Sequence, residues 1–97
     1  MKKKSHLSLA RYLIDNMHNE DLEKHRRTFL IGNIWPDCIP SFITKRHTID
    51  ETFDLLKKEI IEITENHDWS KGITRSFCRH LGIITHYVAD YFTLPQD

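Results

Sequence analysis

The last eighteen residues of the chain, HLGIITHYVADYFTLPQD, place an imidazole and a carboxylate four positions apart, at His86 and Asp90. Residues i and i+4 are neighbours on one face of an α-helix, so these two side chains can approach the same point. Two chemistries are open to such a pair. A neutral imidazole can hydrogen-bond to the carboxylate, or both groups can bind one divalent cation such as zinc, which accepts either ligand type.

The surroundings of this pair predict that it is buried. A helix is expected to start near Ser70 or Gly72, with an apolar stripe of Ile73, Phe77, Leu81, Ile84 and Val88. His86 and Asp90 fall roughly opposite that stripe, and the stretch from His80 onward contains no lysine, arginine or glutamate. A helix that is apolar or small nearly all round belongs in the interior, where an unpaired carboxylate is costly.

His6 is a third candidate ligand, because it shares the apolar face of a first predicted helix. Ser5 is the expected N-cap of that helix, whose apolar positions are Ala10, Leu13, Ile14 and Met17. A second helix is expected to begin after Asn19 and to end at Gly32, with Leu22, Phe29 and Leu30 as its apolar residues.

Asp37 and His47 belong to the segment between Gly32 and His47, which is expected to be a structured loop because Pro36 and Pro40 exclude a continuous helix. Thr48 and Glu51 form a capping box that starts a third helix directly after His47. Its core-facing stripe is expected to be Ile49, Phe53, Leu56, Ile60 and Ile63. The candidate ligands can therefore converge near the last helix of a small bundle, where such sites are commonly built.

Length and composition bound the remaining possibilities. The 97 residues favour a single domain, an all-α bundle of about four helices, and 14 basic residues balance 14 acidic ones. No net field attracts nucleic acid, so no nucleic-acid partner is predicted. We find no secretory signal and no transmembrane segment, and the two cysteines, Cys38 and Cys78, favour free thiols in a cytoplasmic protein.

Taken in order, Ser5-His6-Leu7, PDCIPSF, RHTID and RHLGIITHYVADYFTLP resemble the motifs of the zinc-dependent phospholipase C proteins. The last stretch is similar to the family signature Leu-Gly-x-x-x-His-Tyr-x-x-Asp, and the resemblance spans residues 5 to 95. It implies the N-terminal part of the phospholipase C/nuclease-like helical fold. It also implies hydrolysis of a phosphodiester, such as a phospholipid, by metal-activated water.

The resemblance also implies a ligand set. Asp37, His47 and His86 match three ligands of one zinc, Asp90 matches the carboxylate that bridges to a second, and His6 matches a ligand of that second ion. Asp37 is in addition the implied catalytic residue, which orients or deprotonates the attacking water.

A third zinc site is not encoded by these residues. Gln96 stands where the family has a histidine, and the family's later His-x-x-x-Glu helix does not follow. We therefore expect residues 1–97 to form a partial, C-terminally truncated domain with up to two zinc sites and low or no activity.

The alternative is a non-catalytic helical module that binds metal or another protein, with exposed apolar surface through which it can form homo-oligomers. Other candidates have ordinary interpretations beside a functional one. Cys38 is a metal ligand or a small buried thiol, and Trp35 and Phe42 line a lipid-binding rim or anchor the loop. His25, Arg26 and Arg27 meet a phosphate or form a solvated face. His18, His25, His67 and His80 match no motif and are expected at the surface or rim.

Overall fold

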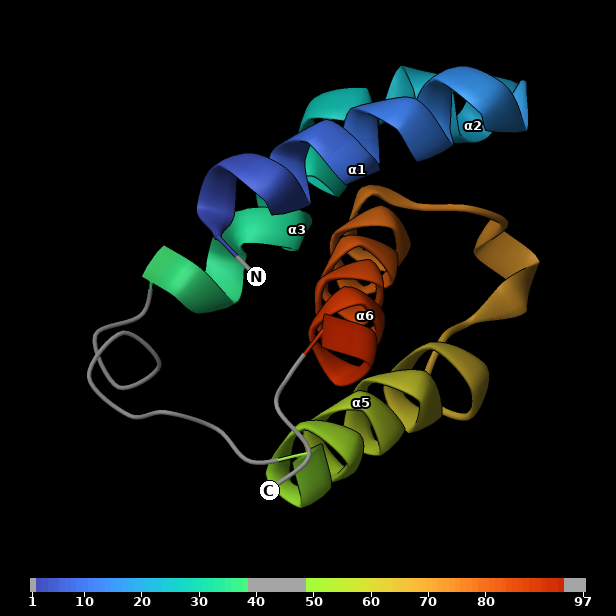
Figure 1. Ribbon diagram of the computed structural model, residues 1–97. Helices are drawn as coiled ribbons and strands as arrows, with labels where there is room; N and C mark the ends of the chain where they lie inside the picture. The colour runs from blue at the N-terminus through green and yellow to red at the C-terminus, as the bar shows by residue number, and fades with distance from the viewer. Residues whose placement is uncertain (1, 39–48, 94–97) are drawn as a thin grey trace.

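The computed structural model describes residues 2–38 and 49–93, and over these residues the chain is helical without any strand (Figure 1). The elements are α1 (Lys3–Met17), α2 (Glu20–Lys24), α3 (Arg26–Cys38), α5 (Ile49–Thr64), the 3₁₀ helix η1 (Trp69–Lys71) and α6 (Arg75–Thr93). The predicted all-α bundle is confirmed for this part of the chain. None of its helices combines the length and the apolar character that crossing a bilayer requires.

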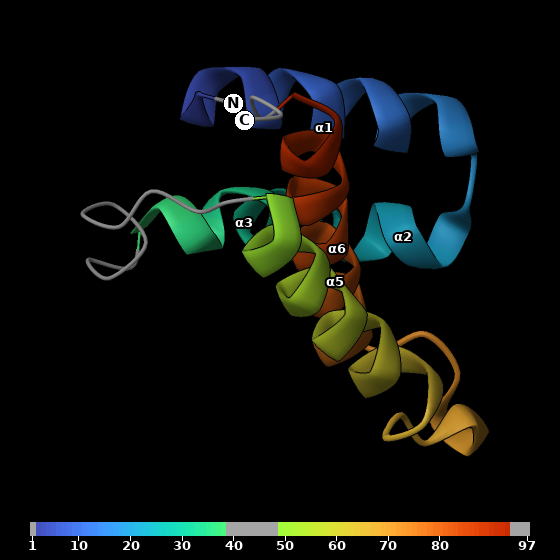
Figure 2. The ribbon, with the colours of Figure 1, turned by 60° about the horizontal axis from the view of Figure 1, so that its bottom comes forward.

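Helix α6 is the centre of the arrangement. It packs against α3 on one side and against α5 on another, while α1 lies across α3 and the C-terminal part of α6 (Figures 1 and 2). Its buried residues are Cys78, Gly82, Ile83, His86, Tyr87 and Ala89. The prediction that this helix lies in the interior is therefore confirmed.

The face of α6 that is most deeply buried differs from the predicted apolar stripe. None of the stripe residues is fully buried, and Val88 is 37% exposed. The buried residues instead include the small Cys78, Gly82 and Ala89 beside Ile83, Tyr87 and His86. Small residues let neighbouring backbones approach closely, and this close approach outweighs the larger apolar area that the stripe offers.

Gly32 of α3 and Gly82 of α6 mark the point where the two helices cross. A Cβ atom on Gly82 would overlap the carbonyl oxygen of Phe29, and one on Gly32 would overlap the carbonyl oxygen of Arg79. Only glycine fits where two backbones approach so closely. Asn33 follows Gly32 directly and His86 lies one turn after Gly82, so this crossing also places two residues of the site described below.

The apolar core lies among α1, α2, α3 and the first half of α6. Its buried members are Ala10, Ile14, Leu22, Phe29 and Cys78, with Leu30, Ile73 and Leu81 packed against them. Burial, with a smaller effect of the nearby Asp21 charge, raises the pKa of the Cys78 thiol. Both cysteines are free, as predicted, but Cys38 is exposed, so its interpretation as a small buried thiol is wrong.

Of three helix boundaries predicted from the sequence, the structure confirms one and contradicts two. Asn19 caps α2, since its side chain accepts a hydrogen bond from the Leu22 N–H, which confirms the predicted start. Helix α1 begins at Lys3 with Lys2 as N-cap, so the prediction of Ser5 as N-cap is wrong. The predicted second helix is interrupted at His25, the C-cap of α2.

The expected loop after Gly32 is helical as far as Cys38, which places Asp37 in the last turn of α3 rather than in a loop. Pro36 lies inside α3, two residues before its end, and is buried. Proline removes the donor for only one carbonyl, that of Gly32, and burial in the bundle offsets that loss of roughly 3 kcal/mol. Residues 39–48, with Phe42, His47 and the capping residue Thr48, lie outside the described residues.

Helix α5 begins at Ile49, as predicted, but part of its predicted core-facing stripe is exposed. Thr52 is the buried residue of α5, whereas Phe53 and Ile60 of the predicted core stripe are 49% and 42% exposed. The prediction of that stripe as core-facing is wrong for these two positions. Helix α6 is the main neighbour of α5, and a single neighbour covers only one narrow strip of a helix.

We expect Gly82→Ala to destabilise the protein by about 2 kcal/mol or more, because overpacking of two backbones forces the helices apart. The sign is informative, since replacing glycine by alanine inside a helix ordinarily stabilises by about 1 kcal/mol. Urea unfolding measures this change. Gly72→Ala is the control: its φ of 67° makes alanine strained, yet nothing lies within 4 Å of the added Cβ. Gly82→Ala should lower the free energy of unfolding by more than Gly72→Ala does; an equal loss in both variants would contradict the role of the crossing.

Candidate metal centre

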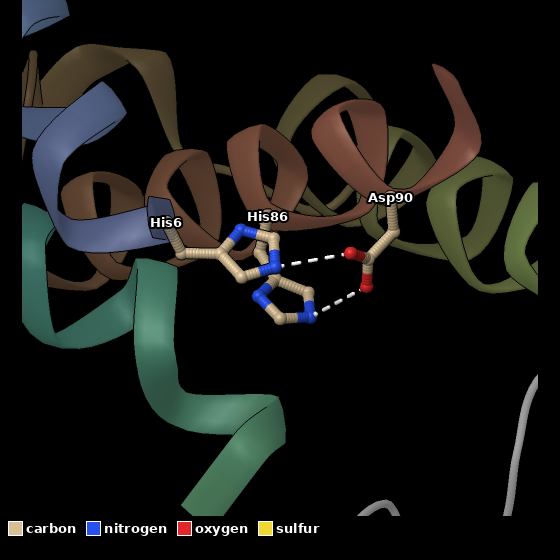
Figure 3. Close-up of side chains that lie close together, drawn as sticks. All are labelled: His6, His86 and Asp90. Atoms are coloured by element: carbon tan, nitrogen blue, oxygen red, sulfur yellow. Dashed lines mark hydrogen bonds and ion pairs between the residues drawn. The ribbon is translucent and has the colours of Figure 1, made fainter. Parts of the chain in front are cut away.

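Three potential metal ligands from two helices converge at one end of the interface between α1, α3 and α6 (Figure 3). His6 comes from α1, and His86 and Asp90 come from α6. The potential ligand atoms of all three lie within 4.8 Å of one another. His6 Nε2 is 3.0 Å from Asp90 Oδ1, and His86 Nε2 is 3.0 Å from Asp90 Oδ2. Each imidazole therefore faces a different oxygen of the same carboxylate.

Helix periodicity and burial place these side chains. His6 lies one turn before Ala10 on the buried face of α1, and His86 precedes Asp90 by one turn on α6. The two imidazole rings stack, with centroids 3.8 Å apart and planes 21° from parallel. His6 is 0% exposed and His86 is 2% exposed, while the Asp90 side chain keeps 19%. The cluster is therefore held within the bundle, and the carboxylate forms its most accessible part.

A backbone contact fixes the proton position on His86. Its Nδ1 lies 2.7 Å from the carbonyl oxygen of Asn33. A carbonyl can only accept, so Nδ1 carries the hydrogen, and a neutral His86 then presents the lone pair of Nε2 to Asp90 Oδ2. Two electron pairs facing each other at 3.0 Å need a positive charge between them, either a proton or a metal cation. Hydrogen bonding of the distal nitrogen to a carbonyl is also how metal-binding histidines are commonly oriented.

The charge of Asp90 suits a metal ligand. Burial raises the pKa of this carboxyl, but hydrogen bonds from His6 and His86 and attraction to these two rings act in the opposite direction. The net result is a pKa well below the ordinary value. Asp90 is therefore ionised at neutral pH, which is the form that binds a cation.

The donor set fits zinc. Two imidazole nitrogens and a carboxylate are zinc ligands at about 2.0 to 2.2 Å, and in a tetrahedral site this separates two ligand atoms by about 3.3 Å. The two nitrogen–oxygen distances of 3.0 Å lie close to that separation. Small side-chain shifts would therefore accommodate an ion beside each imidazole.

The described structure brings together three of the five ligands that the resemblance implies. Asp37 lies in α3, one helical turn after Asn33, but its side chain is not among the described parts. His47 lies outside the described residues, so its role and that of Asp37 stay predictions. Sequence reasoning missed Asn33, because Pro36 was expected to exclude a helix in this segment. A continuous helix would have placed Asn33 and Asp37 four residues apart on one face.

Two further histidines, His67 and His80, have structural partners outside the cluster. His80 Nδ1 lies 2.7 Å from Glu59 Oε2 and links α6 to α5. His67 hydrogen-bonds to the Gly72 carbonyl and contacts the rings of Trp69 and Phe77. Both side chains are partly exposed, which agrees with the predicted rim positions.

The structure also decides between the alternatives left open for Arg26 and Trp35. Arg26 forms ion pairs with Asp15 and Glu23 on the surface, which favours the solvated face over a phosphate site. Trp35 is 48% exposed and lines a groove between α3, α5 and α6, so it is not a core anchor.

We expect Asp90→Asn to lower zinc affinity by at least about 100-fold, because it removes the one charged ligand that both imidazoles share. Isothermal titration of metal-free protein with zinc measures this. Asp68→Asn is the matched control, since Asp68 is also a hydrogen-bonded carboxylate, accepting from Ser70, but lies on the surface away from the cluster. Unchanged zinc binding by the Asp90 variant would exclude this carboxylate as a ligand.

The lowered pKa of Asp90 also predicts a pH dependence in the metal-free protein. A carboxyl with a lower pKa in the folded state stabilises the fold above its unfolded pKa of about 4 and loses this contribution as the pH falls further. Asp90→Asn should therefore reduce the free energy of unfolding at pH 7 and cost progressively less below pH of about 4. Urea unfolding with a chelator present measures both, and an equal cost at both pH values would contradict the assignment.

Comparison with known proteins gives one finding. A family model described as zinc-dependent phospholipase C matches residues 5–93. No curated protein and no solved structure shows significant similarity to the chain.

Proposed function

The chain belongs to the zinc-dependent phospholipase C family, and from this premise we propose that it is a zinc-dependent phosphodiester hydrolase with a metal centre at His6, His86 and Asp90. The observation that carries the proposal is the shared carboxylate. Its two oxygens face two different imidazoles at 3.0 Å, as a carboxylate that bridges two cations would. The match covers most of the chain, and the cluster lies on the first and last helices of the matched range.

Each residue has a proposed role. His86, with Asp37 and His47, would hold one zinc ion, and His6 would hold a second, while Asp90 would bind both. The Asn33 carbonyl keeps the lone pair of His86 Nε2 directed at the centre. Asp37 would orient the attacking water or accept its proton. When bound, zinc lowers the pKa of water toward about 7 and neutralises charge on the phosphoryl oxygens.

A phospholipid is the proposed substrate. The family description supports this class, and so does an apolar groove between α1 and α6, lined by Leu9, Leu13, Ile84, Thr85, Val88, Ala89, Phe92 and Thr93. None of these side chains is charged, which suits a lipid better than a polyanion such as a nucleic acid. Thr85 and Ala89 of the groove directly precede His86 and Asp90 in the sequence.

Hydrolysis should depend on zinc and on the proposed ligands. We expect zinc-loaded protein to hydrolyse a short-chain phosphatidylcholine slowly, because Gln96 does not supply the third-site histidine that the family resemblance implies. Asp37→Asn and His86→Ala should each reduce the rate by about 10² to 10⁴. Release of the phosphorylated head group, with a soluble phosphodiester and single-stranded DNA as alternative substrates, measures the activity.

His25→Ala is the control for these substitutions, because His25 lies at the end of α2 away from the cluster. It should leave the rate unchanged. A rate that survives His86→Ala or a chelator would contradict zinc-dependent hydrolysis. Cleavage of the DNA in preference to the lipid would overturn the proposed substrate but not the metal centre.

A non-catalytic binding module is the second candidate, and exposed apolar surface favours it. Phe92 is 79% exposed beside the groove between α1 and α6, and Phe53 and Ile60 are exposed on α5. This candidate requires self-association or partner binding through these residues. Light scattering, which detects self-association, together with the absence of zinc-dependent hydrolysis distinguishes it from the hydrolase.

A further inference from the structure

Two polar side-chain atoms in the described part of the chain are buried without a hydrogen-bond partner, and both lie beside the candidate metal centre. They are Nδ1 of His6 and Oδ1 of Asn33. These residues are 0% and 1% exposed. An unpaired buried polar atom destabilises a protein. Two such atoms on neighbouring helices indicate that these side chains find hydrogen-bond partners in another state of the protein, such as the metal-bound one.

The orientation of the Asn33 amide is defined by its other atom. Nδ2 donates a hydrogen bond to the Phe29 carbonyl at 3.0 Å, so Oδ1 is the atom that stays unpaired. The backbone carbonyl of the same residue accepts the Nδ1 hydrogen of His86. Asn33 is therefore already the residue that selects the metal-binding tautomer of one imidazole.

His6 requires a hydrogen-bond acceptor when it binds a metal. Its Nε2 faces Asp90 Oδ1, so Nε2 is the nitrogen that would bind a cation. Once Nε2 uses its lone pair for a metal, the neutral ring carries its hydrogen on Nδ1. Metal binding therefore creates a buried donor on His6, while Asn33 holds a buried acceptor without a partner.

The two atoms are linked through His86. Its ring stacks on His6 with centroids 3.8 Å apart, and its Nδ1 lies 2.7 Å from the carbonyl oxygen of Asn33. His6, His86 and Asn33 thus form one buried contact between α1, α6 and α3. Both unpaired atoms belong to residues of this one contact, and a water molecule is a common bridge between a donor and an acceptor placed in this way.

We propose that Asn33 is a positioning residue for both imidazoles: its carbonyl orients His86, and its side-chain Oδ1 accepts the Nδ1 hydrogen of His6, directly or through one water, when His6 binds a cation. This inference rests on the metal centre proposed above. It goes further by assigning an outer partner to His6 and a reason for the unpaired amide oxygen.

Asn33→Leu tests the proposal, because leucine keeps a similar volume and removes Oδ1. Without metal, the variant should unfold several degrees higher than wild type, since an unpaired buried oxygen is gone. With zinc, its affinity should fall by about 10- to 100-fold, the usual effect of removing an outer hydrogen-bond partner. Differential scanning calorimetry and zinc titration measure the two shifts.

Nitrogen-15 NMR of the zinc-loaded protein gives the structural readout. The Nδ1 hydrogen of His6 should exchange slowly with water in wild type and at least about tenfold faster in Asn33→Leu. The Nδ1 hydrogen of His86 should be protected in both and serves as an internal reference. Asn33→Asp, which keeps an oxygen acceptor, should retain the slow exchange at His6. If Asn33→Leu fails to fold, Asn33→Ala replaces it in both experiments, because alanine also removes Oδ1.

Asn16→Leu is the matched control. Asn16 makes the same side-chain bond to the carbonyl four residues earlier, that of Tyr12, but lies exposed on α1. Its substitution should leave zinc affinity and imidazole exchange unchanged. Unaltered zinc affinity and unaltered His6 exchange in Asn33→Leu would overturn this inference alone. Wild-type protein that binds no zinc would overturn the proposed metal centre as well.

Discussion

The partly buried charge of Asp90 constrains the rest of the described structure. An ionised carboxylate that is largely removed from water needs positive charge or several hydrogen-bond donors nearby. His86 meets part of that need from the same helix, one turn away, and His6 meets another part from α1. Because His6 is 84 positions away in the chain, the first and last helices must pack together for Asp90 to be paired. The same arrangement that compensates the charge also assembles three metal ligands.

The close crossing of α3 and α6 makes this arrangement possible. Gly32 and Gly82 bring the two backbones into contact, so the carbonyl of Asn33 reaches the ring of His86. Bulkier residues at the crossing would move α3 away and leave the His86 ring without its orienting partner. Fold and site therefore depend on the same two glycines. The apolar core begins at Ala10, one turn after His6 on the buried face of α1, so core and cluster adjoin.

Much of this organisation could be predicted from the sequence. The helical class, the interior position of the last helix and the pairing of His86 with Asp90 followed from periodicity and from the lack of lysine, arginine and glutamate after His80. The burial of His6 followed from its position on an apolar face. Tertiary packing determined what the sequence could not indicate: Pro36 is tolerated near the end of α3, and Asn33 joins the site because that helix continues. The predicted core-facing stripe of α5 was also wrong at Phe53 and Ile60, which are exposed. A repeat of apolar residues shows which side of a helix is apolar but not which neighbouring helix covers that side.

Diffraction from crystals of zinc-loaded protein, recorded at the zinc absorption edge, tests the central claim most directly. The account predicts an anomalous peak about 2.0 to 2.2 Å from His86 Nε2 and from an oxygen of Asp90. A second peak beside His6 Nε2 would show that the carboxylate bridges two ions. Zinc bound elsewhere on the chain, with His86 and Asp90 still in direct contact at 3.0 Å, would contradict the assignment of this cluster as a metal centre.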